Sequence, residues 1–418
     1  MKPQDLGDGL TMRNATAEDI PALLEHFRAV HGEGVVDQLR AMLEHYPRFS
    51  WENSFIIANS ESGEVVSCVL LVQNAWLLDG IEVPSVEMEA VGTLESYRYR
   101  GHTRLLNEEY ERLANQLHSV IQTIAGIPYF YRNFGYEYAA ALGGGYPVNP
   151  SLIPKLPDRE KEPVTFEMLD AKRFEEFLAY REKHLPRSTW IRKIRTEDAA
   201  YLIYETTSHE QEAFYFYLVK EHGKTVGVFY LARWENRLDI VELYLDDHQH
   251  VDAVLRFAVS RALEWDGIPV RVNLPNQARI REYVNARTQV KDVGRYAWYI
   301  KIPSITRFIE TISPLFSNRL KDTEFPDFTG ELTVTDYKQG YSLSFDGGVF
   351  KVITEKSEKK IDDYHLRMPR NQLTRLLMGY ETLDGIASHE PDVQCAADLK
   401  PLVRALFPKL EAMVDPYY

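Results

Sequence analysis

The chain has 418 residues, more than one hydrophobic core usually serves, so two or three domains are expected. Hydrophobic residues make up 44% of it and charged residues 26%, which is the composition of a globular protein and excludes an intrinsically disordered one. The net charge of −14 repels phosphate backbones and argues against nucleic acid as a partner. The same acidity favours solubility, and it would also suit a pocket that attracts a cationic amine.

The two cysteines, Cys68 and Cys395, lie far apart and outside any CxxC or Cys/His spacing. Neither a disulfide framework nor a zinc site is expected, and no metal is predicted. Residues 1–19 lack an apolar core, and no later apolar run approaches the ~20 residues that a membrane-spanning helix needs. These features predict a cytoplasmic protein without export or membrane insertion.

The first third of the chain predicts a strand, a helix, three strands, a helix, a strand and a short helix. The expected strands are 10–14, 54–58, 65–72, 81–93 and 119–124. Thr16 is an N-cap for the first helix, in which one face is apolar. That face carries Ile20, Leu23, Leu24 and Phe27. The second helix has an apolar face made of Leu106, Tyr110, Leu113 and Leu117.

The remaining two thirds divide at a proline cluster and again near Pro303. The prolines between 147 and 157 exclude a helix or a central strand, so a linker is expected there. A similar order of elements follows, and residues 221–226 echo 61–66 at a turn, which suggests a duplicated fold. The strands expected in this part are 214–219, 226–233, 238–245 and 270–274, with a helix at 251–265. A small α+β domain is predicted last, with strands at 332–335, 341–345 and 349–353 and helices at 305–312, 370–380 and 399–412.

The strongest chemical signal is residues 91–104, which run from a strand through a loop into a helix. A loop at a helix N-terminus offers unpaired N–H groups and the positive end of the helix dipole, which suits a diphosphate. Gly101 allows the backbone to approach a phosphate closely. Arg98, Arg100 and Arg104 add positive charge. A solvated basic loop before an ordinary helix would show the same short pattern.

A second signal is the aromatic stretch 129–136, which is typical of a short helix that ends at Gly135. Core packing explains Phe134 and Tyr136. Tyr131 differs because its hydroxyl, with an ordinary pKa of ~10, can return a proton to a thiolate leaving group.

These two motifs resemble those of the GNAT acetyltransferase superfamily, whose cofactor motif is Q/R-x-x-G-x-G/A and whose later motif reads roughly F-Y-x-x-F/L-G-Y/F. The likeness covers residue 10 to about residue 145. The wider layout resembles the enhanced intracellular survival (Eis) family. That resemblance implies an α+β fold with two tandem GNAT-like mixed-sheet modules at 1–150 and 160–302, the second of them degenerate. A small sterol-carrier-like α+β domain would follow at 303–418.

The resemblance also implies a function: an N-acetyltransferase that moves an acetyl group from acetyl-CoA to a primary amine by direct attack. The strand 91–93 would pair with pantetheine, the loop 99–104 would hold the pyrophosphate, and residues 126 and 127 would lie beside the pantetheine arm. The implied cofactor-binding residues are Val91, Gly92, Thr93, Arg98, Tyr99, Arg100, Gly101, His102, Thr103, Arg104, Gly126 and Ile127. The acceptor would be an amino sugar, an aminoglycoside-like amine or a lysine side chain, and the protein would be a homo-oligomer, a hexamer by family resemblance.

Two candidates exist for the group that takes the amine proton. The resemblance implies Tyr131 as general acid and the C-terminal carboxylate of Tyr418 as proton acceptor. Glu87 and Glu89 lie on one face of the strand before the cofactor motif, and Glu87 is the alternative base.

The second module departs from the cofactor motif and suggests a different reading of the protein. Asp246 and Asp247 stand where glycine and arginine are expected, and they would repel a diphosphate, so this module is expected to be an inactive scaffold. The alternative function is a lipid- or sterol-binding carrier with a vestigial acetyltransferase module, which would need a deep cavity lined by aliphatic side chains.

Overall fold

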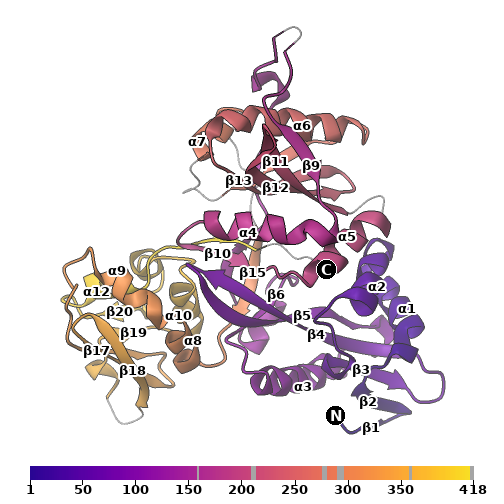
Figure 1. The fold of residues 1–418 in the computed structure, drawn as a ribbon. Coiled ribbons are helices and arrows are strands. Elements are labelled where there is room, and N and C mark those ends of the chain that lie inside the picture. Colours follow the sequence, from indigo (N-terminus) through magenta and orange to yellow (C-terminus); the bar gives the residue numbers. More distant parts are fainter. Residues whose placement is uncertain (158–159, 209–212, 275–279, 290–295, 357–359, 415–418) are drawn as a thin grey trace.

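The computed structural model describes residues 1–157, 160–208, 213–274, 280–289, 296–356 and 360–414. Three β-sheets with their helices form three parts of a mixed α+β molecule (Figure 1). Helices α4 (Phe174–His184) and α5 (Asp198–Ser208) lie between the part at the top of the view and the part at the lower right. No helix in the described part of the chain has the length and apolar character needed to cross a membrane.

The first sheet holds ten strands among the described residues, in the order β1-β2-β3-β4-β5-β6-β15-β7, with β10 and β21 attached at its side. Its consecutive elements are β1 (Gln4–Gly7), β2 (Leu10–Asn14), α1 (Ile20–His31), α2 (Val36–His45), β3 (Ser54–Asn59), β4 (Val65–Leu78), β5 (Ile81–Thr93), α3 (His102–Gln116), β6 (Ile121–Ile124) and β7 (Glu137–Leu142). The strands that reach it from later in the chain are β10 (Thr189–Arg192), β15 (Tyr296–Lys301) and β21 (Glu411–Met413). All five predicted strands are confirmed, whereas α2 was not predicted.

The second sheet has the order β8-β14-β13-β12-β11-β9. Its elements are β8 (Tyr146–Pro147), β9 (Thr165–Met168), β11 (Ala213–Glu221), β12 (Lys224–Trp234), β13 (Arg237–Leu245), α6 (Val251–Leu263), β14 (Val270–Val272) and α7 (Arg281–Asn285). The stretch predicted as a linker contributes β8 and buries Val148 and Ile153 in this core, so it is part of the fold. Pro147 is tolerated because β8 is an edge strand, where a missing N–H breaks no ladder.

The two larger sheets share one topology. In each, an antiparallel meander leads through a helix to a strand that pairs in parallel with the last meander strand, β5 with β6 and β13 with β14. The next position is filled by a strand from the other half of the chain, β15 beside β6 and β8 beside β14. The two halves therefore exchange strands, and each sheet includes a segment of its neighbour.

The third sheet has the order β18-β17-β16-β19-β20. Its elements are α8 (Ile305–Ile312), α9 (Phe316–Leu320), β16 (Gly330–Thr335), β17 (Gly340–Asp346), β18 (Val349–Lys356), β19 (Leu366–Arg367), α10 (Arg370–Leu377), α11 (Leu383–Ala387), β20 (Gln394–Cys395) and α12 (Lys400–Leu406). The helix predicted at 399–412 is wrong at its end: α12 stops before Pro408, which cannot continue a helix. Residues 411–413 instead form β21, which pairs in parallel with β10.

Three buried tryptophans join these parts. Trp76, Trp190 and Trp298 come from β4, β10 and β15, and the rings of Trp190 and Trp298 lie 6.2 and 6.1 Å from that of Trp76. All three belong to the core that extends into the third sheet. The indole Nε1 of Trp298 donates to the carbonyl of Val414 at 2.7 Å, so the last described residue is held at the junction.

Candidate active site

A cleft opens where two parallel strands part. Strands β5 and β6 pair only from Ser85 to Glu87 and from Ile121 to Thr123. Just beyond this point β5 carries a bulge, marked by Ala90 with a φ of +48°. A cleft of about 870 Å³ lies between the separated strand ends, lined by residues 88–93 of β5 and by residues 124–127, which begin at the last residue of β6.

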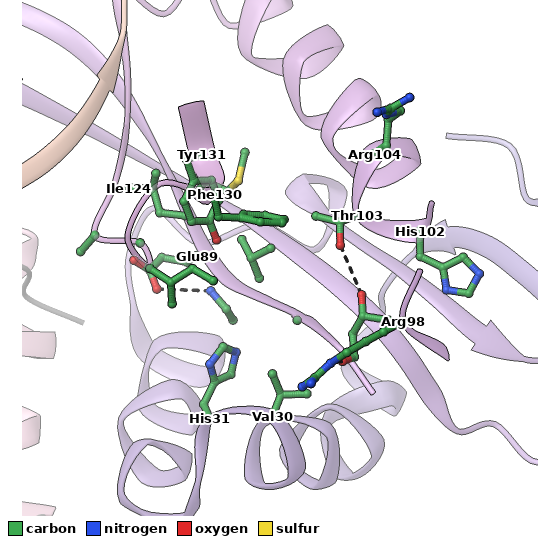
Figure 2. A pocket seen from close by; sticks show the side chains of 18 of the residues that line it. Val30, His31, Glu89, Arg98, His102, Thr103, Arg104, Ile124, Phe130 and Tyr131 are labelled. Atoms are coloured by element: carbon green, nitrogen blue, oxygen red, sulfur yellow. Dashed lines mark hydrogen bonds between the residues drawn. The ribbon is translucent and has the colours of Figure 1, made fainter. Parts of the chain in front are cut away.

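One end of the cleft is a cationic cradle at the start of α3. Gly101 caps this helix in the left-handed conformation (φ +82°), and no side-chain cap is made in the described structure, so the first N–H groups face the cleft region. Arg98, Thr103 and Arg104 line the same end (Figure 2). The Arg98 Nε donates to the Thr93 carbonyl at 3.3 Å. This end of the cleft can bind a phosphate or diphosphate group.

Arg100, although predicted for this cradle, does not line the cleft. Its guanidinium donates to the Ser96 carbonyl at 3.3 Å and lies 5.1 Å from the centre of the Tyr97 ring. His102 does line the cleft, and burial together with the nearby Arg100 charge lowers the pKa of its imidazole. A neutral His102 therefore borders the cradle at neutral pH.

Tyr131 lies at the opposite end, on the 3₁₀ helix Phe130–Phe134 that follows the cleft wall (Figure 2). Its ring packs against Phe130, Tyr136 and Tyr299 and is 6% exposed. Burial, and after it the nearby Glu89 charge, raises the pKa of the Tyr131 hydroxyl. The phenol therefore keeps its proton at neutral pH and can serve as a proton donor.

The strand glutamates differ in their access to the cleft. Glu89 is half-buried and lines the cleft near Tyr131, whereas Glu87 is fully buried and does not line it. The pKa of Glu89 is raised well above its usual range by burial and by the Glu87 charge. Although Glu87 was the predicted alternative base, Glu89 is the carboxyl group that an acceptor in the cleft would meet.

Two tyrosines of strand β15 form hydrogen bonds to the backbone of the cleft wall. The Tyr296 hydroxyl donates to the carbonyl of Gly126 at 2.7 Å, and the Tyr299 hydroxyl accepts from the N–H of Tyr129 at 2.6 Å. Tyr129 has a φ of +69°, an unfavourable conformation for a tyrosine that this hydrogen bond helps to hold. The turn that places Tyr131 therefore depends on a strand from the second half of the chain.

The remaining wall comes from α1, α2 and the short turn of 3₁₀ helix between them, which were not predicted to belong to the site. Its residues are Val30, His31, Val35, Gln38 and Leu39. The imidazole of His31 bonds to the backbone of Ala90, and burial lowers its pKa, so it is neutral near pH 7. The glycines at 32 and 34, which interrupt the two helices beside the cleft, are the signal in the sequence that could have revealed this wall.

The second half has a different arrangement at the corresponding place. Its strand β13 carries Glu242, which forms a two-pronged ion pair with Arg181 of α4 at 2.6 and 2.8 Å. Both side chains are buried, with exposures of 3% and 1%. A short turn led by Asp247 stands before α6 in place of a glycine cap. Glu242 is therefore occupied by an internal partner.

The structure gathers most of the predicted site residues around one cleft. Those that line it are Val91, Gly92, Thr93, Arg98, Tyr99, Gly101, His102, Thr103, Arg104, Gly126, Ile127 and Tyr131. Arg100 lies outside, and Tyr418 is not among the described residues. The sequence analysis missed Glu89 as the accessible carboxyl group, because the point where β5 and β6 separate depends on pairing that is distant in sequence.

Known proteins share this fold. The family model of the GNAT acetyltransferase domain matches residues 11–139. A GCN5-related N-acetyltransferase from Anabaena variabilis is similar over 97% of this chain and 99% of its own, with 15% identity and a TM-score of 0.69. One from Kribbella flavida covers 98% of each chain with 16% identity and a TM-score of 0.70. Eis1 from Mycobacterium abscessus covers 97% of this chain and 100% of its own, with 14% identity and a TM-score of 0.61. No curated protein matches the sequence.

Residues 11–139 are therefore a GNAT acetyltransferase domain, and this domain contains the cleft. The predicted resemblance to the GNAT superfamily and the predicted enzyme class, an acetyltransferase, are confirmed for residues 11–139 by the family model. The full-length likeness to these structures extends the shared fold over the second and third sheets.

Replacing Gly126 by alanine tests the placement of Tyr131. A Cβ at this position would overlap the Tyr131 ring, so the ring must move. A shift of ~1 Å in a catalytic group can lower a rate by about 10²-fold, and we expect a loss of this order in acetyl transfer, measured as release of free CoA thiol. Gly34→Ala is the matched control, because a Cβ there meets no atom within 4 Å. Equal activity of the two variants would show that the position of Tyr131 is unimportant.

Proposed function

We propose that this protein transfers the acetyl group of acetyl-CoA to a primary amine in the cleft between β5 and β6. The observation that carries the proposal is the layout of this cleft. A cationic cradle lies at one end, and a protonated phenol and a carboxyl group lie at the other, with separated strand ends between them. An elongated donor with a phosphate head and a reactive tail fits this order of groups.

The donor would lie along the strand gap with its pyrophosphate in the cradle. The first N–H groups of α3 and the guanidinium groups of Arg98 and Arg104 supply donors and positive charge for the phosphates. The edge of β5 from 91 to 93 faces the gap left by β6, so its backbone is available to the pantetheine arm. Residues 126 and 127 border the same path, which brings the thioester toward Tyr131.

The chemistry is a direct attack. The amine nitrogen forms a bond to the thioester carbonyl carbon, and the bond from that carbon to sulfur breaks. The Tyr131 phenol, which is protonated at neutral pH, gives its proton to the sulfur as the thiolate develops, and the phenolate regains a proton from solvent when the products leave. The amine must lose one proton to a base in the same cleft.

Two groups are candidates for that base. Glu89 lines the cleft beside Tyr131. The carboxylate of Tyr418, which lies outside the described residues, stays a prediction. It is supported by the direction of β21, which runs parallel to β10 and so leads the chain toward Arg192 and the buried Glu87.

The acceptor is proposed to be a small amine, such as an amino sugar or an aminoglycoside-like compound, or a lysine side chain. The wall from α1 and α2 combines apolar side chains with the neutral His31. Glu89 adds an acidic group at the reacting end, and the protein's net charge of −14 favours approach of a cation.

We extend the proposal to the whole chain as two tandem GNAT-like modules at 1–150 and 160–302 and a sterol-carrier-like domain at 303–418, acting in the cytoplasm. The shared topology of the two larger sheets supports the duplication. A hexamer is proposed from the resemblance to the Eis family. Light scattering at micromolar concentration checks it, and a monomeric mass would contradict it.

Binding of acetyl-CoA tests the cradle. The wild-type protein should be stabilised by acetyl-CoA, since a ligand at ~100 times its Kd adds about 2.7 kcal/mol. Gly101→Val should weaken binding by about tenfold or more, because a β-branched residue resists the φ of +82° that the loop needs. Gly101→Asn should bind nearly as well as wild type, since asparagine tolerates this conformation. Equal affinity of the valine variant and wild type, measured calorimetrically, would argue against the cradle.

The acid and the base are tested by three changes. Tyr131→Phe should lower kcat by about 10²-fold or more while acetyl-CoA binding is unchanged. A short extension after Tyr418 moves any terminal carboxylate away and leaves every side chain intact. Glu89→Gln removes the carboxyl group of β5 that borders the cleft. If the extended protein loses kcat and Glu89→Gln does not, Tyr418 is the base, and the opposite pair of results assigns the proton to Glu89.

A further inference from the structure

A line of buried polar groups leads from the cleft into the second half of the protein. It begins at Glu89, continues to Glu87 on the same strand and reaches Arg192 on β10. Arg192 and Glu87 are 2% and 0% exposed, and an Arg192 terminal nitrogen lies 3.3 Å from Glu87 Oε2. Charges interact strongly there because little water screens them. The line places a cation of the second half directly behind the carboxyl groups of the cleft.

The hydrogen-bond donors around Glu87 bond to one of its carboxyl oxygens, and the other oxygen is available to Glu89. Asn74 Nδ2 donates to Glu87 Oε2 at 3.0 Å, and Arg192 donates to the same oxygen. Glu87 Oε1 is buried and receives no donor from the described residues, and the side chains of Glu87 and Glu89 contact each other. Two carboxyl oxygens form a hydrogen bond only when a proton lies between them. A pair that bonds in this way would hold one proton between its two side chains.

The groups that hold Glu87 are themselves fixed. The Tyr46 hydroxyl donates to Asn74 Oδ1 at 2.7 Å, which turns the amide nitrogen of Asn74 toward Glu87. Behind Arg192, the Arg181 guanidinium donates to the Arg192 carbonyl at 3.0 Å while it holds Glu242. The backbone of Arg192 is therefore held on one side by the pairing of β10 with β4 and on the other by an ion pair of the second half.

We propose that Arg192 is a positioning residue for acetyl transfer, which keeps Glu87 ionised behind Glu89 so that the two carboxyl groups relay a proton from the acceptor amine. The inference rests on the proposed function. In the relay an N–H bond of the attacking amine breaks, and the proton binds the cleft-facing oxygen of Glu89. The proton that Glu89 shared with Glu87 passes fully to Glu87. The pair changes from one proton to two, and the extra proton returns to solvent through the cleft when the products leave.

The electrostatic surroundings favour this starting state. Burial raises the pKa of Glu87, and the Arg192 charge opposes that rise. Burial and the Glu87 charge raise the pKa of Glu89 further, so the shared proton resides mainly on Glu89. Arg48, which is paired with Asp198, donates to the Tyr46 hydroxyl at 2.8 Å. The other titratable groups near this network among the described residues are Tyr131, Tyr110, Tyr46 and His31. Burial keeps all four neutral near pH 7, since it raises the phenol pKa values and lowers that of the imidazole.

The charge of Arg192 sets the pH at which the pair takes up its second proton. A nearby cation disfavours protonation, so its removal lets the second proton bind at higher pH. Both carboxyl groups are then protonated before the amine attacks, so the pair cannot accept the amine proton and turnover is lost. In Arg192→Met the acid limb of kcat should therefore move to higher pH by about one unit or more, and kcat at neutral pH should fall by about tenfold. Activity should recover at alkaline pH.

Arg192→Lys keeps the charge and should keep the acid limb near its wild-type position. Glu87→Gln cannot accept the relayed proton, so its kcat should be low at every pH. Arg271→Met is the matched control, because it removes an ion pair with Asp239 in the second sheet and should leave the profile unchanged. Each variant should bind acetyl-CoA with wild-type affinity. A purely structural role for Arg192 would lower activity evenly and leave the limb in place, and that result would overturn the proposal.

A double variant and infrared spectroscopy test the role of Arg192 independently of the single variants. If Arg192→Met alone does not fold, the double variant Glu87→Gln/Arg192→Met removes the unpaired carboxylate, and it should fold and lack the wild-type acid limb. Infrared difference spectra follow the C=O stretch of protonated carboxyl groups without any acceptor, and Arg192→Lys and Arg192→Met should gain this band at different pH. Identical band titrations would overturn the relay. Failure of wild type to acetylate any primary amine would instead count against the proposed function.

Discussion

The exchange of strands between the two larger sheets is the constraint on which the cleft depends. Because β15 occupies the place beside β6, its tyrosines hold the turn that presents Tyr131. Because β10 pairs with the far end of β4, Arg192 lies against the buried face of β5. Both contacts reach the cleft-lining residues from elements that are distant in sequence. The groups of the proposed reaction belong to the first half of the chain, whereas the residues that hold them in place belong to the second.

The two halves share a topology and differ in how each treats the glutamate of the strand before the crossover helix. In the first half Glu87 is buried beside Arg192, and Glu89 remains at the cleft. In the second half Glu242 is closed off by Arg181. A buried ion pair adds little to stability on average, since desolvation offsets the attraction between the charges. The value of the Arg181 and Glu242 pair lies in its geometry, because Arg181 also holds the backbone of Arg192.

Local patterns predicted the elements that form from neighbouring residues. The meander strands, the cradle before α3 and the aromatic 3₁₀ helix each follow from spacing, turn residues and a helix cap, and all three are present. The sequence analysis did not find β15 or β10, and it took the residues of β21 for helix. These short strands gain their stability from partners that are distant in sequence. A strand of four residues carries too little periodicity to identify when the pairing that stabilises it is nonlocal. The prolines near β8 predicted a linker, but an edge strand tolerates proline, and which strand lies at the edge depends on nonlocal pairing.

The same limit explains why Glu87 and Glu89 could be recognised as a pair but not ranked. Alternation along a strand correctly places both on one face. Which of them meets a ligand depends on where β6 leaves β5, and pairing ends at Glu87. Glu89 lies beyond the end of this pairing, so its carboxyl group borders the cleft. Glu87 lies within the paired region and is buried against Arg192. The strand separation that makes room for a donor thus also divides two chemically identical side chains, giving one access to the ligand and the other a fixed cation.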